Sequence, residues 1–512
     1  MAVLEHLEPI KVFQYFEEIC GIPHGSGNIR AISDYLAEFA RKRNLEYYQD
    51  KLGNVIIIKE ASKGYENADP VMLQGHMDMV AVSDKDADID LVNEGLYLAI
   101  DGDEVYAEGT TLGGDDGIAL AYILAILDSK DAEHPRLEAV FTVDEEVGMD
   151  GAKEIDLSVC RAGRMINIDS EEEGYLLAGC AGGATFQAAF PLHYTSCTAV
   201  GSETCHLTVT GLQGGHSGTE IHREPGNANL ILARVIYRLM KRDGIHLVWL
   251  DGGKKDNAIP HMAEAELLIE KDVYDIIYEE YLTVYEEIKN ELKLRDPGVC
   301  IRLESTDSMD IQSLNVNLPE AQSLEVQSVE LPLQKAQSGK IIEDNCAKEL
   351  LSLIQVMPQG VCGMSPAVQG LVETSLNLGV LTMEEDKVFL GYSVRSSVAS
   401  RKEELLERMK ILCEHYGASW NLHGVYPGWE YRMESPLRDT MCGIFKDMYG
   451  KDMVLQAIHA GLECGFFAEK IPGLDCVSFG PDIKDIHTTR ERLSISSAKR
   501  MYEYLLEVLK AL

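Results

Sequence analysis

One short apolar segment of the chain ends in two side chains that can form or support a metal site. The run at 71–74 has the length of a buried strand, and His76 and Asp78 follow it two residues apart. Alternate residues of a strand point to the same side, so one of the two side chains can hold a metal ion while the other orients it. A histidine and an aspartate at this spacing also occur by chance, so the interpretation depends on ligands elsewhere in the chain.

Further acidic and imidazole side chains lie just past other apolar strands, or in a glycine-rich loop that leads into an apolar helix predicted over 118–127. In open α/β sheets, ligands bind at the carboxyl ends of the strands. Taken singly, each of these residues is more often part of a solvated turn or an exposed strand end, but together they recur in one predicted sheet. The group consists of His76 and Asp78 after 71–74, Asp115 and Asp116 in the loop 111–117, Glu145 and Glu146 after 137–143, Asp169 after 165–168, and His487 after 475–479.

The residue types in this group match the ligands of a divalent metal. Two imidazoles and several carboxylates form a mixed nitrogen and oxygen set, which suits zinc and, less selectively, cobalt or manganese. The ligands suffice for two ions if one carboxylate bridges them, and such a pair, about 3.5–4 Å apart, can polarise a carbonyl and hold a hydroxide nucleophile. No HExxH, P-loop, GxSxG or GxGxxG motif offers a competing site.

Composition limits the classes of function that the chain can have. Its 512 residues exceed what one hydrophobic core holds, so two domains are expected. The formal net charge of −38 argues against a nucleic acid or an anionic membrane as partner. The acidic N-terminal segment does not resemble a targeting signal, and no apolar run reaches the roughly 18 residues of a membrane span. Twelve scattered cysteines without a C-x-x-C pair favour free thiols in a reducing cytoplasm.

Strands and helices alternate near both ends of the chain, whereas the middle has a different pattern. The two outer parts are typical of an α/β domain with a largely parallel sheet, and Ser26 or Asn28 is expected to cap its first clear helix. In the middle, alternating strands such as 206–210 and 263–269 predict an antiparallel sheet in an inserted α+β domain. The expected boundaries are 1–187 and 428–512 for the α/β domain and 188–427 for the insertion, in which the similar segments 312–316, 322–326 and 327–331 have no assigned chemistry.

Four blocks of sequence, taken together, resemble the metal-site blocks of the M20 metallopeptidases. They are Leu-Gln-Gly-His-Met-Asp-Met-Val at 73–80, Thr-Leu-Gly-Gly-Asp-Asp-Gly-Ile at 111–118, Thr-Val-Asp-Glu-Glu-Val-Gly-Met at 142–149 and Asn-Ile-Asp-Ser at 167–170. The blocks follow the family's order, and the resemblance covers essentially the whole chain and is strongest to the dipeptidases of the family, including those that act on aminoacyl-histidine. It implies a zinc-peptidase-like α/β catalytic domain with a mostly parallel mixed sheet flanked by helices, and an inserted α+β lid domain.

The resemblance also implies a role for each residue of the group. Two Zn²⁺ ions per subunit are expected, and Co²⁺ or Mn²⁺ can substitute for them. Glu145 would be the general base and Glu146 a ligand, although the sequence by itself does not separate the two glutamates. One ion would be held by His76 and Asp169 and the second by Glu146 and His487, with Asp115 as the bridge and Asp78 orienting His76; Asp116, which varies among relatives, is left out.

The family's remaining site residues also have counterparts in this chain. His216, in Gly-Gly-His-Ser-Gly, would stabilise the tetrahedral intermediate, and in several relatives it does so across a dimer interface. Dimeric and monomeric relatives both exist, and a homodimer is expected here. Asn257 and Arg395 would contact the substrate, with the guanidinium binding the C-terminal carboxylate of a peptide. Gly461 would line the opposite side of the pocket. Three histidines are left as structural residues: His24, His222 and His459.

The leading hypothesis is therefore a cytoplasmic di-zinc dipeptidase that cleaves unblocked dipeptides, with Xaa-His peptides such as β-alanyl-histidine among them. A deacylase or tripeptide aminopeptidase of the same family is the nearest alternative, and N-blocked substrates distinguish it from a dipeptidase. A non-catalytic metal-dependent binding protein is a third hypothesis. The presence of Glu145 argues against it, because a binding protein needs ligands but no base.

Overall fold

The computed structural model describes residues 3–196, 201–305 and 340–512. The similar segments at 312–316, 322–326 and 327–331 lie outside the described residues. No helix within the described ranges is long and apolar enough to cross a membrane. The cysteines in these ranges are free thiols, and most of them are buried.

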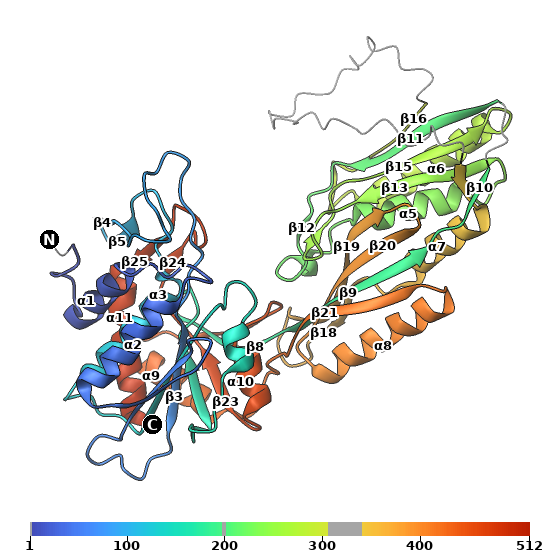
Figure 1. Cartoon of the computed structure of the whole chain (residues 1–512). Helices are drawn as coiled ribbons and strands as arrows, with labels where there is room; N and C mark the ends of the chain where they lie inside the picture. The colour runs from blue at the N-terminus through green and yellow to red at the C-terminus, as the bar shows by residue number, and fades with distance from the viewer. Residues whose placement is uncertain (1–2, 197–200, 306–339) are drawn as a thin grey trace. The chain divides into compact units, whose positions relative to one another are not determined.

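The described residues form two compact units (Figure 1). One unit contains the chain up to Gly182, residues 367–369 and the chain from Tyr426 onward. The other contains the described residues of 183–366 and residues 370–425. Both ends of the chain therefore build the first unit, and the middle of the chain builds the second.

The first unit is built on an eight-stranded mixed sheet in the order β1-β2-β6-β3-β7-β23-β8-β22. Strand β3 is parallel to β6 and β7, β7 is parallel to β23, and β8 is parallel to β22. Only the β1–β2, β2–β6 and β23–β8 pairs of this sheet are antiparallel. The carboxyl ends of β6, β3 and β7 thus meet at one edge. The strands are β1 (Glu46–Gln49), β2 (Val55–Lys59), β3 (Val71–His76), β6 (Leu137–Thr142), β7 (Arg164–Asn167), β8 (Tyr175–Cys180), β22 (Val454–Ile458) and β23 (Asp475–Ser478).

Helices cover both faces of this sheet, which explains why its strands read as continuous apolar runs. Val55 and Ile57 belong to the hydrophobic cluster on one face, and Ile56 and Ile58 belong to the cluster on the other. This alternation follows from the two-residue period of a strand. The first cluster includes residues of α1 (Ile10–Cys20), α2 (Arg30–Arg43), α3 (Gly114–Asp128), α9 (Pro436–Tyr449) and α11 (Ile495–Ala511), and the second includes residues of α4 (Asp150–Glu154) and α10 (Cys464–Lys470).

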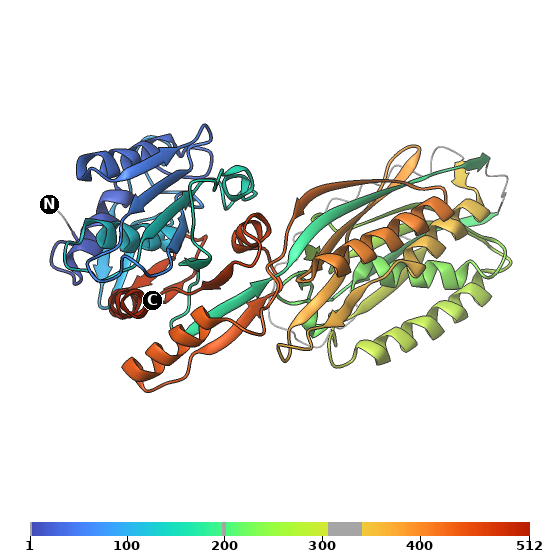
Figure 2. The same ribbon diagram turned by 90° about the horizontal axis from the view of Figure 1, so that it is seen from below.

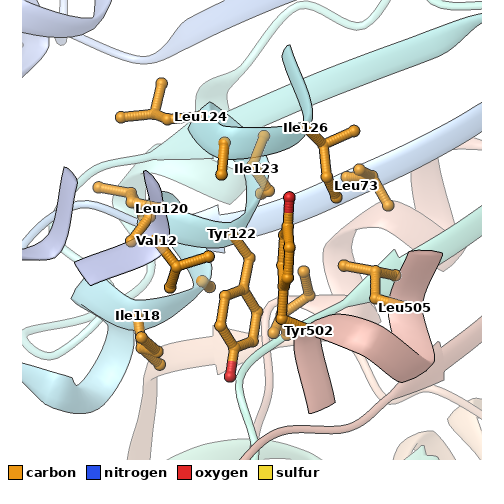
Figure 3. Packing of buried hydrophobic residues seen from close by; sticks show 14 of the residues in the cluster. Val12, Leu73, Ile118, Leu120, Tyr122, Ile123, Leu124, Ile126, Tyr502 and Leu505 are labelled. Carbon is orange, nitrogen blue, oxygen red and sulfur yellow. The ribbon is translucent and has the colours of Figure 1, made fainter. Parts of the chain in front are cut away.

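Helix α3 is buried from Gly114 to Leu127, and Figure 3 shows its side chains packed among Val12, Leu73, Tyr502 and Leu505. Its Tyr122 ring lies against Tyr502 of α11, with the ring centroids 5.5 Å apart, and the Tyr122 hydroxyl donates a hydrogen bond of 2.6 Å to the carbonyl oxygen of Ala498. A helix that is apolar all round is stable only when it is enclosed in this way. The packing of α3 fixes the position of its N-terminal end, where Asp115 lies.

A small four-stranded sheet in the first unit holds the segment that contains His487. Its order is β24-β25-β5-β4, and all three pairs are antiparallel. His487 lies in the loop between β24 and β25. The strands are β4 (Leu98–Asp101), β5 (Glu104–Ala107), β24 (Ile483–Lys484) and β25 (Arg492–Ser494).

The second unit is a large, mainly antiparallel sheet with four helices packed on one face (Figure 2). Its strand order is β16-β11-β15-β13-β19-β20-β9-β21, and β18 pairs with β19. The predicted α/β fold class with an additional α+β part is therefore confirmed. The strands are β9 (Gly182–Pro191), β11 (Ser202–Thr210), β13 (Ile245–Gly252), β15 (Ala263–Glu270), β16 (Cys300–Ser305), β18 (Gly360–Met364), β19 (Val372–Met383), β20 (Lys387–Ser396) and β21 (Ser419–Tyr426), and the helices are α5 (Ala228–Leu239), α6 (Tyr274–Leu292), α7 (Asp344–Val356) and α8 (Ala399–His415).

Candidate metal centre

Side chains from five separate segments of the first unit converge at the carboxyl edge of β6, β3 and β7. His76 is the last residue of β3, the two glutamates follow β6, and Asp169 comes two residues after β7. Asp115 lies in the first turn of α3, which begins at Gly114 rather than at the predicted residue 118, so the loop expected around Asp115 is shorter. The converging residues are His76, Asp115, Asp116, Glu145, Glu146, Asp169 and His487.

The carboxylate of Asp115 lies between the two histidines. Its Oδ1 is 3.1 Å from Nε2 of His76, and its Oδ2 is 3.3 Å from Nε2 of His487. The same nitrogen of His76 is 3.7 Å from Oδ1 of Asp169, and that of His487 is 2.9 Å from Oε1 of Glu146. Each histidine thus has one carboxylate of its own and shares Asp115 with the other.

The pKa values of the two histidines at this edge are raised by the carboxylates around them. Burial alone would lower the pKa of His76, but hydrogen bonds with Asp115 and Asp169 raise it well above its usual value. Hydrogen bonds with Asp115 and Glu146 raise the pKa of His487 to about 10. Burial opposes ionisation of Asp115, yet hydrogen bonds from both histidines hold its pKa below the usual range. The carboxylates that raise the pKa values of the two histidines would favour a bound cation for the same electrostatic reason.

The donor atoms fit a divalent cation. Three groups, His76–Asp116–Asp169, His76–Glu145–Glu146 and Asp115–Glu146–His487, each have ligand atoms within 4.8 Å of one another. Imidazole nitrogen combined with carboxylate oxygen is a set that zinc accepts readily. Asp116, which the sequence analysis left out, is buried, and its Oδ2 accepts a hydrogen bond of 3.1 Å from the backbone N–H of His76.

Asp78 contacts both His76 and the segment that follows β6. Nδ1 of His76 is 2.9 Å from the backbone oxygen of Asp78 and 3.6 Å from its carboxylate. The carboxylate also accepts hydrogen bonds from the N–H of Glu145, at 3.0 Å, and from the hydroxyl of Ser26, at 2.8 Å. Ser26 therefore does not cap a helix, and neither does Asn28, because α2 begins at Arg30 without a side-chain cap.

The surroundings of Glu145 raise the pKa of its carboxyl group. Burial, together with the charges of Asp169, Glu463 and Glu146, raises its pKa well above the usual value, although His76 opposes the shift. A raised pKa makes a carboxylate a stronger proton acceptor, which is the property that general-base chemistry needs. Its neighbour Glu146 instead directs Oε1 to His487.

Residues 72–511 match the sequence model of peptidase family M20/M25/M40. The chain belongs to this peptidase family. It is therefore a peptide hydrolase.

The likeness to individual M20 peptidases extends over the whole chain. The chain is 34% identical over 510 residues to the cytosol non-specific dipeptidase of Escherichia coli (strain K12), covering 100% of this chain and 99% of that protein. The crystal structure of the aminoacylhistidine dipeptidase from Vibrio alginolyticus superposes with a TM-score of 0.89 at 33% identity, covering 99% of this chain and 98% of that one. The aminopeptidase PepT from Bacillus cereus ATCC 10987, with a TM-score of 0.55 at 15% identity over 98% of both chains, shares the fold.

Three predicted residues of this M20 peptidase lie in its second unit, apart in the chain but near one another in space. His216, in β12 (Gly215–His216), pairs with Ala258 of β14 (Ala258–Ile259), directly after Asn257. Burial and the nearby charge of Arg395 lower the pKa of His216, which favours the neutral imidazole. Gly461 belongs to the first unit, where an added Cβ would lie 2.8 Å from the ring of Tyr426.

The sequence analysis missed two buried glutamates in the C-terminal part of the peptidase. Glu463 is 0% exposed, and its Oε2 accepts hydrogen bonds from Gln74 at 2.6 Å and from Thr142 at 2.7 Å. It therefore ties the turn that contains Gly461 to β3 and β6, and burial raises its pKa to about 7. The sequence feature that could have indicated a buried Glu463 is its place between apolar and small residues, in Gly-Leu-Glu-Cys-Gly. The second glutamate is Glu491, which lies four residues after His487.

Proposed function

We propose that this protein is a di-zinc dipeptidase that hydrolyses unblocked dipeptides, Xaa-His peptides such as β-alanyl-histidine among them. The observation that carries the proposal is the position of the Asp115 carboxylate, with one oxygen toward His76 and the other toward His487. The substrate class is supported by the two full-length relatives, one named a non-specific dipeptidase and the other an aminoacylhistidine dipeptidase.

In this proposal each ion has two ligands of its own and one shared ligand. His76 and Asp169 would hold the first ion, Glu146 and His487 would hold the second, and Asp115 would be the shared ligand. The contacts at 2.9–3.7 Å among these side chains support the assignment. Zinc suits this donor set, and cobalt or manganese can replace it. Two such ions supply the Lewis acidity that polarises the carbonyl of the scissile bond.

Glu145 acts as the general base. It takes a proton from the water that attacks the carbonyl carbon, and it delivers that proton to the amine as the C–N bond breaks. Asp78 holds the backbone of Glu145 through the hydrogen bond of 3.0 Å and so fixes where the base is presented.

In this proposal three further residues contact the substrate. His216 donates to the oxygen on which negative charge develops, Arg395 binds the C-terminal carboxylate of the dipeptide, and Asn257 makes a further substrate contact. Gly461 is proposed to line the substrate pocket. We also propose that residues 188–427 act as a lid and dimerisation domain, that the protein is a homodimer, and that it works in the cytoplasm, as the name of the E. coli relative indicates for that protein.

Activity on a panel of free dipeptides that includes β-alanyl-histidine tests the proposal, with chelation and metal add-back. We expect release of free amino acids that chelation abolishes and zinc restores. Preferential cleavage of N-acyl amino acids or of tripeptides would instead identify a deacylase or aminopeptidase. A zinc-loaded protein that hydrolyses none of these substrates would be a binding protein. Sedimentation equilibrium tests the homodimer.

A further inference from the structure

Glu491 is a buried residue whose carboxylate accepts hydrogen bonds from four consecutive backbone groups. Its side chain lies in the segment between β24 and β25, and the residue is 2% exposed. Oε2 accepts from the N–H groups of Leu112 and Gly113, at 2.8 and 3.2 Å. Oε1 accepts from those of Gly114 and Asp115, at 2.8 and 3.4 Å. One side chain thus holds the stretch that ends in the carboxylate shared by the two histidines.

The local backbone explains why this stretch needs an acceptor from outside. Buried N–H groups require a partner, but the first N–H groups of a helix have none within the helix. Gly114 and Asp115 are the first two residues of α3, and Gly113, with a φ of +66°, precedes it, so these N–H groups need an acceptor from elsewhere. Gly114 lets the carboxylate approach closely, because an added Cβ would lie 3.2 Å from Oε1 of Glu491.

Glu491 also restrains the loop that contains His487. Immediately after Glu491, β25 pairs with β5, with Leu493 opposite Val105. Before the loop, β24 pairs with β25, with Ile483 opposite Leu493. The glutamate is therefore an anchor at the C-terminal end of the loop in which His487 adopts a φ of +62°.

We propose that Glu491 is a positioning residue that ties together the two segments supplying Asp115 and His487. This inference rests on the proposed function in taking those two residues as ligands of one ion. Glu491 reaches no substrate in this scheme. It acts by holding Asp115 where its two oxygens face the two histidines, and metal affinity depends on that position.

Replacing Glu491 by glutamine tests whether both carboxylate oxygens are needed as hydrogen-bond acceptors. A carboxylate has two acceptor oxygens, whereas the amide of glutamine has one acceptor and one donor group. Glu491→Gln therefore sets an NH₂ group against two backbone N–H donors. Glu138 offers a matched control in the same unit, since it is 0% exposed and accepts from the backbone N–H groups of Arg161 and Ala162, at 2.8–2.9 Å. It lies near the start of β6, at the opposite end of the strand from the candidate metal centre.

The test compares the full-length wild type with Glu491→Gln and Glu138→Gln. Metal affinity is measured by competition with a chromophoric zinc chelator, and hydrogen–deuterium exchange is measured for peptides covering 112–115 and 161–162. For Glu491→Gln we expect metal affinity about 10–100-fold weaker, faster exchange at 112–115, and a loss in kcat larger than the change in KM. For Glu138→Gln we expect faster exchange at 161–162, with wild-type metal affinity and kcat.

Two further measurements keep the inference testable if Glu491→Gln does not fold. In the metal-free wild type, the amides of 112–115 must exchange slowly, and Glu491→Asp, which keeps the charge on a shorter side chain, must bind zinc more weakly than the wild type and Glu138→Gln. Fast exchange in the wild type, unchanged zinc affinity in the Glu491 variants, or an equal loss in Glu138→Gln would overturn the inference. A wild type that binds zinc but cleaves no dipeptide would refute the proposed function, while the exchange and affinity data would still decide the role of Glu491.

Discussion

The carboxylate of Asp78 accepts a hydrogen bond of 3.0 Å from the backbone N–H of Glu145. A residue just after β3 thereby fixes the start of the segment that follows β6. The same carboxylate accepts from the hydroxyl of Ser26 at 2.8 Å, so it joins three parts of the chain. These contacts explain how a glutamate in a loop can have a defined position.

Asp78→Ala removes this support, and we expect kcat to fall about 10–100-fold because the base is no longer held in place. Ser26→Ala removes only one of the hydrogen bonds that the Asp78 carboxylate accepts and serves as the milder control. Steady-state kinetics on a dipeptide, with zinc content measured in parallel, provide the check. Wild-type kcat in Asp78→Ala would show that the Asp78–Glu145 contact has no part in the reaction.

Glu145→Gln tests the assignment of the base. The substitution keeps the size of the side chain but removes its ability to accept a proton, so we expect kcat to fall about 10²–10⁴-fold with metal content unchanged. Glu146→Gln should instead lose zinc, because Glu146 is the carboxylate beside His487. If Glu145→Gln loses zinc and Glu146→Gln keeps it, the two roles are reversed.

Removal of metal should lower both activity and thermal stability. A ligand that binds only the folded state at 1,000 times its Kd contributes about 4 kcal/mol to the free energy of unfolding. We therefore expect chelation to abolish dipeptide hydrolysis and to lower Tm measurably, and zinc, cobalt or manganese to restore both to different extents. A Tm that is insensitive to chelation would argue against structural coupling of the metal to the fold.

Gly75→Ala should destabilise the first unit. An added Cβ would lie 2.6 Å from Oδ2 of Asp116 and 3.0 Å from the Cβ of Ala119, so α3 would have to move away from β3. We expect the free energy of unfolding to fall by about 1–3 kcal/mol. In Gly443→Ala, inside α9, an added Cβ meets nothing within 4 Å, and we expect a gain of about 0.5–1 kcal/mol. Urea denaturation of both variants distinguishes close packing from a general effect of alanine.

A pH-dependent contribution to stability is expected from Asp128. Burial favours its neutral form, but hydrogen bonds from Arg43 and Tyr15 hold its pKa below the usual range. A pKa that is depressed in the folded state stabilises the protein above the unfolded pKa of about 3.9, and this stabilisation is lost as the pH falls toward the folded pKa.

Asp128→Asn should therefore lower the free energy of unfolding by about 1 kcal/mol at pH 7, a modest value because the ion pair is partly solvated. The difference from wild type should shrink as the pH falls below 4. Urea denaturation at several pH values measures it, with the exposed Asp131→Asn as control. A difference that stays constant with pH would mean that the charge of Asp128 is not what stabilises the fold.

The sequence by itself predicted most of the candidate ligands, because they directly follow strands that short apolar runs reveal. The apolar runs before His76, Glu145 and Asp169 indicated strands, and parallel strands bring their carboxyl ends to one edge of a sheet. Asp115 was assigned as the bridge by resemblance, but the strand argument did not fit it, since it lies in the first turn of α3. The burial of α3 on every side gives Asp115 its position instead.

Only the tertiary structure decided what supports the ligands. Asp78 holds Glu145, Glu463 holds Gln74 and Thr142, and Glu491 holds the N–H groups of 112–115. In the first and last of these contacts the donor is a backbone N–H, which every residue except proline carries, so the sequence leaves no pattern by which to recognise the pair. The residue types and strand order determined which chemistry the protein can perform. The long-range packing of loops, some joining residues nearly 400 positions apart, determined where those groups are held.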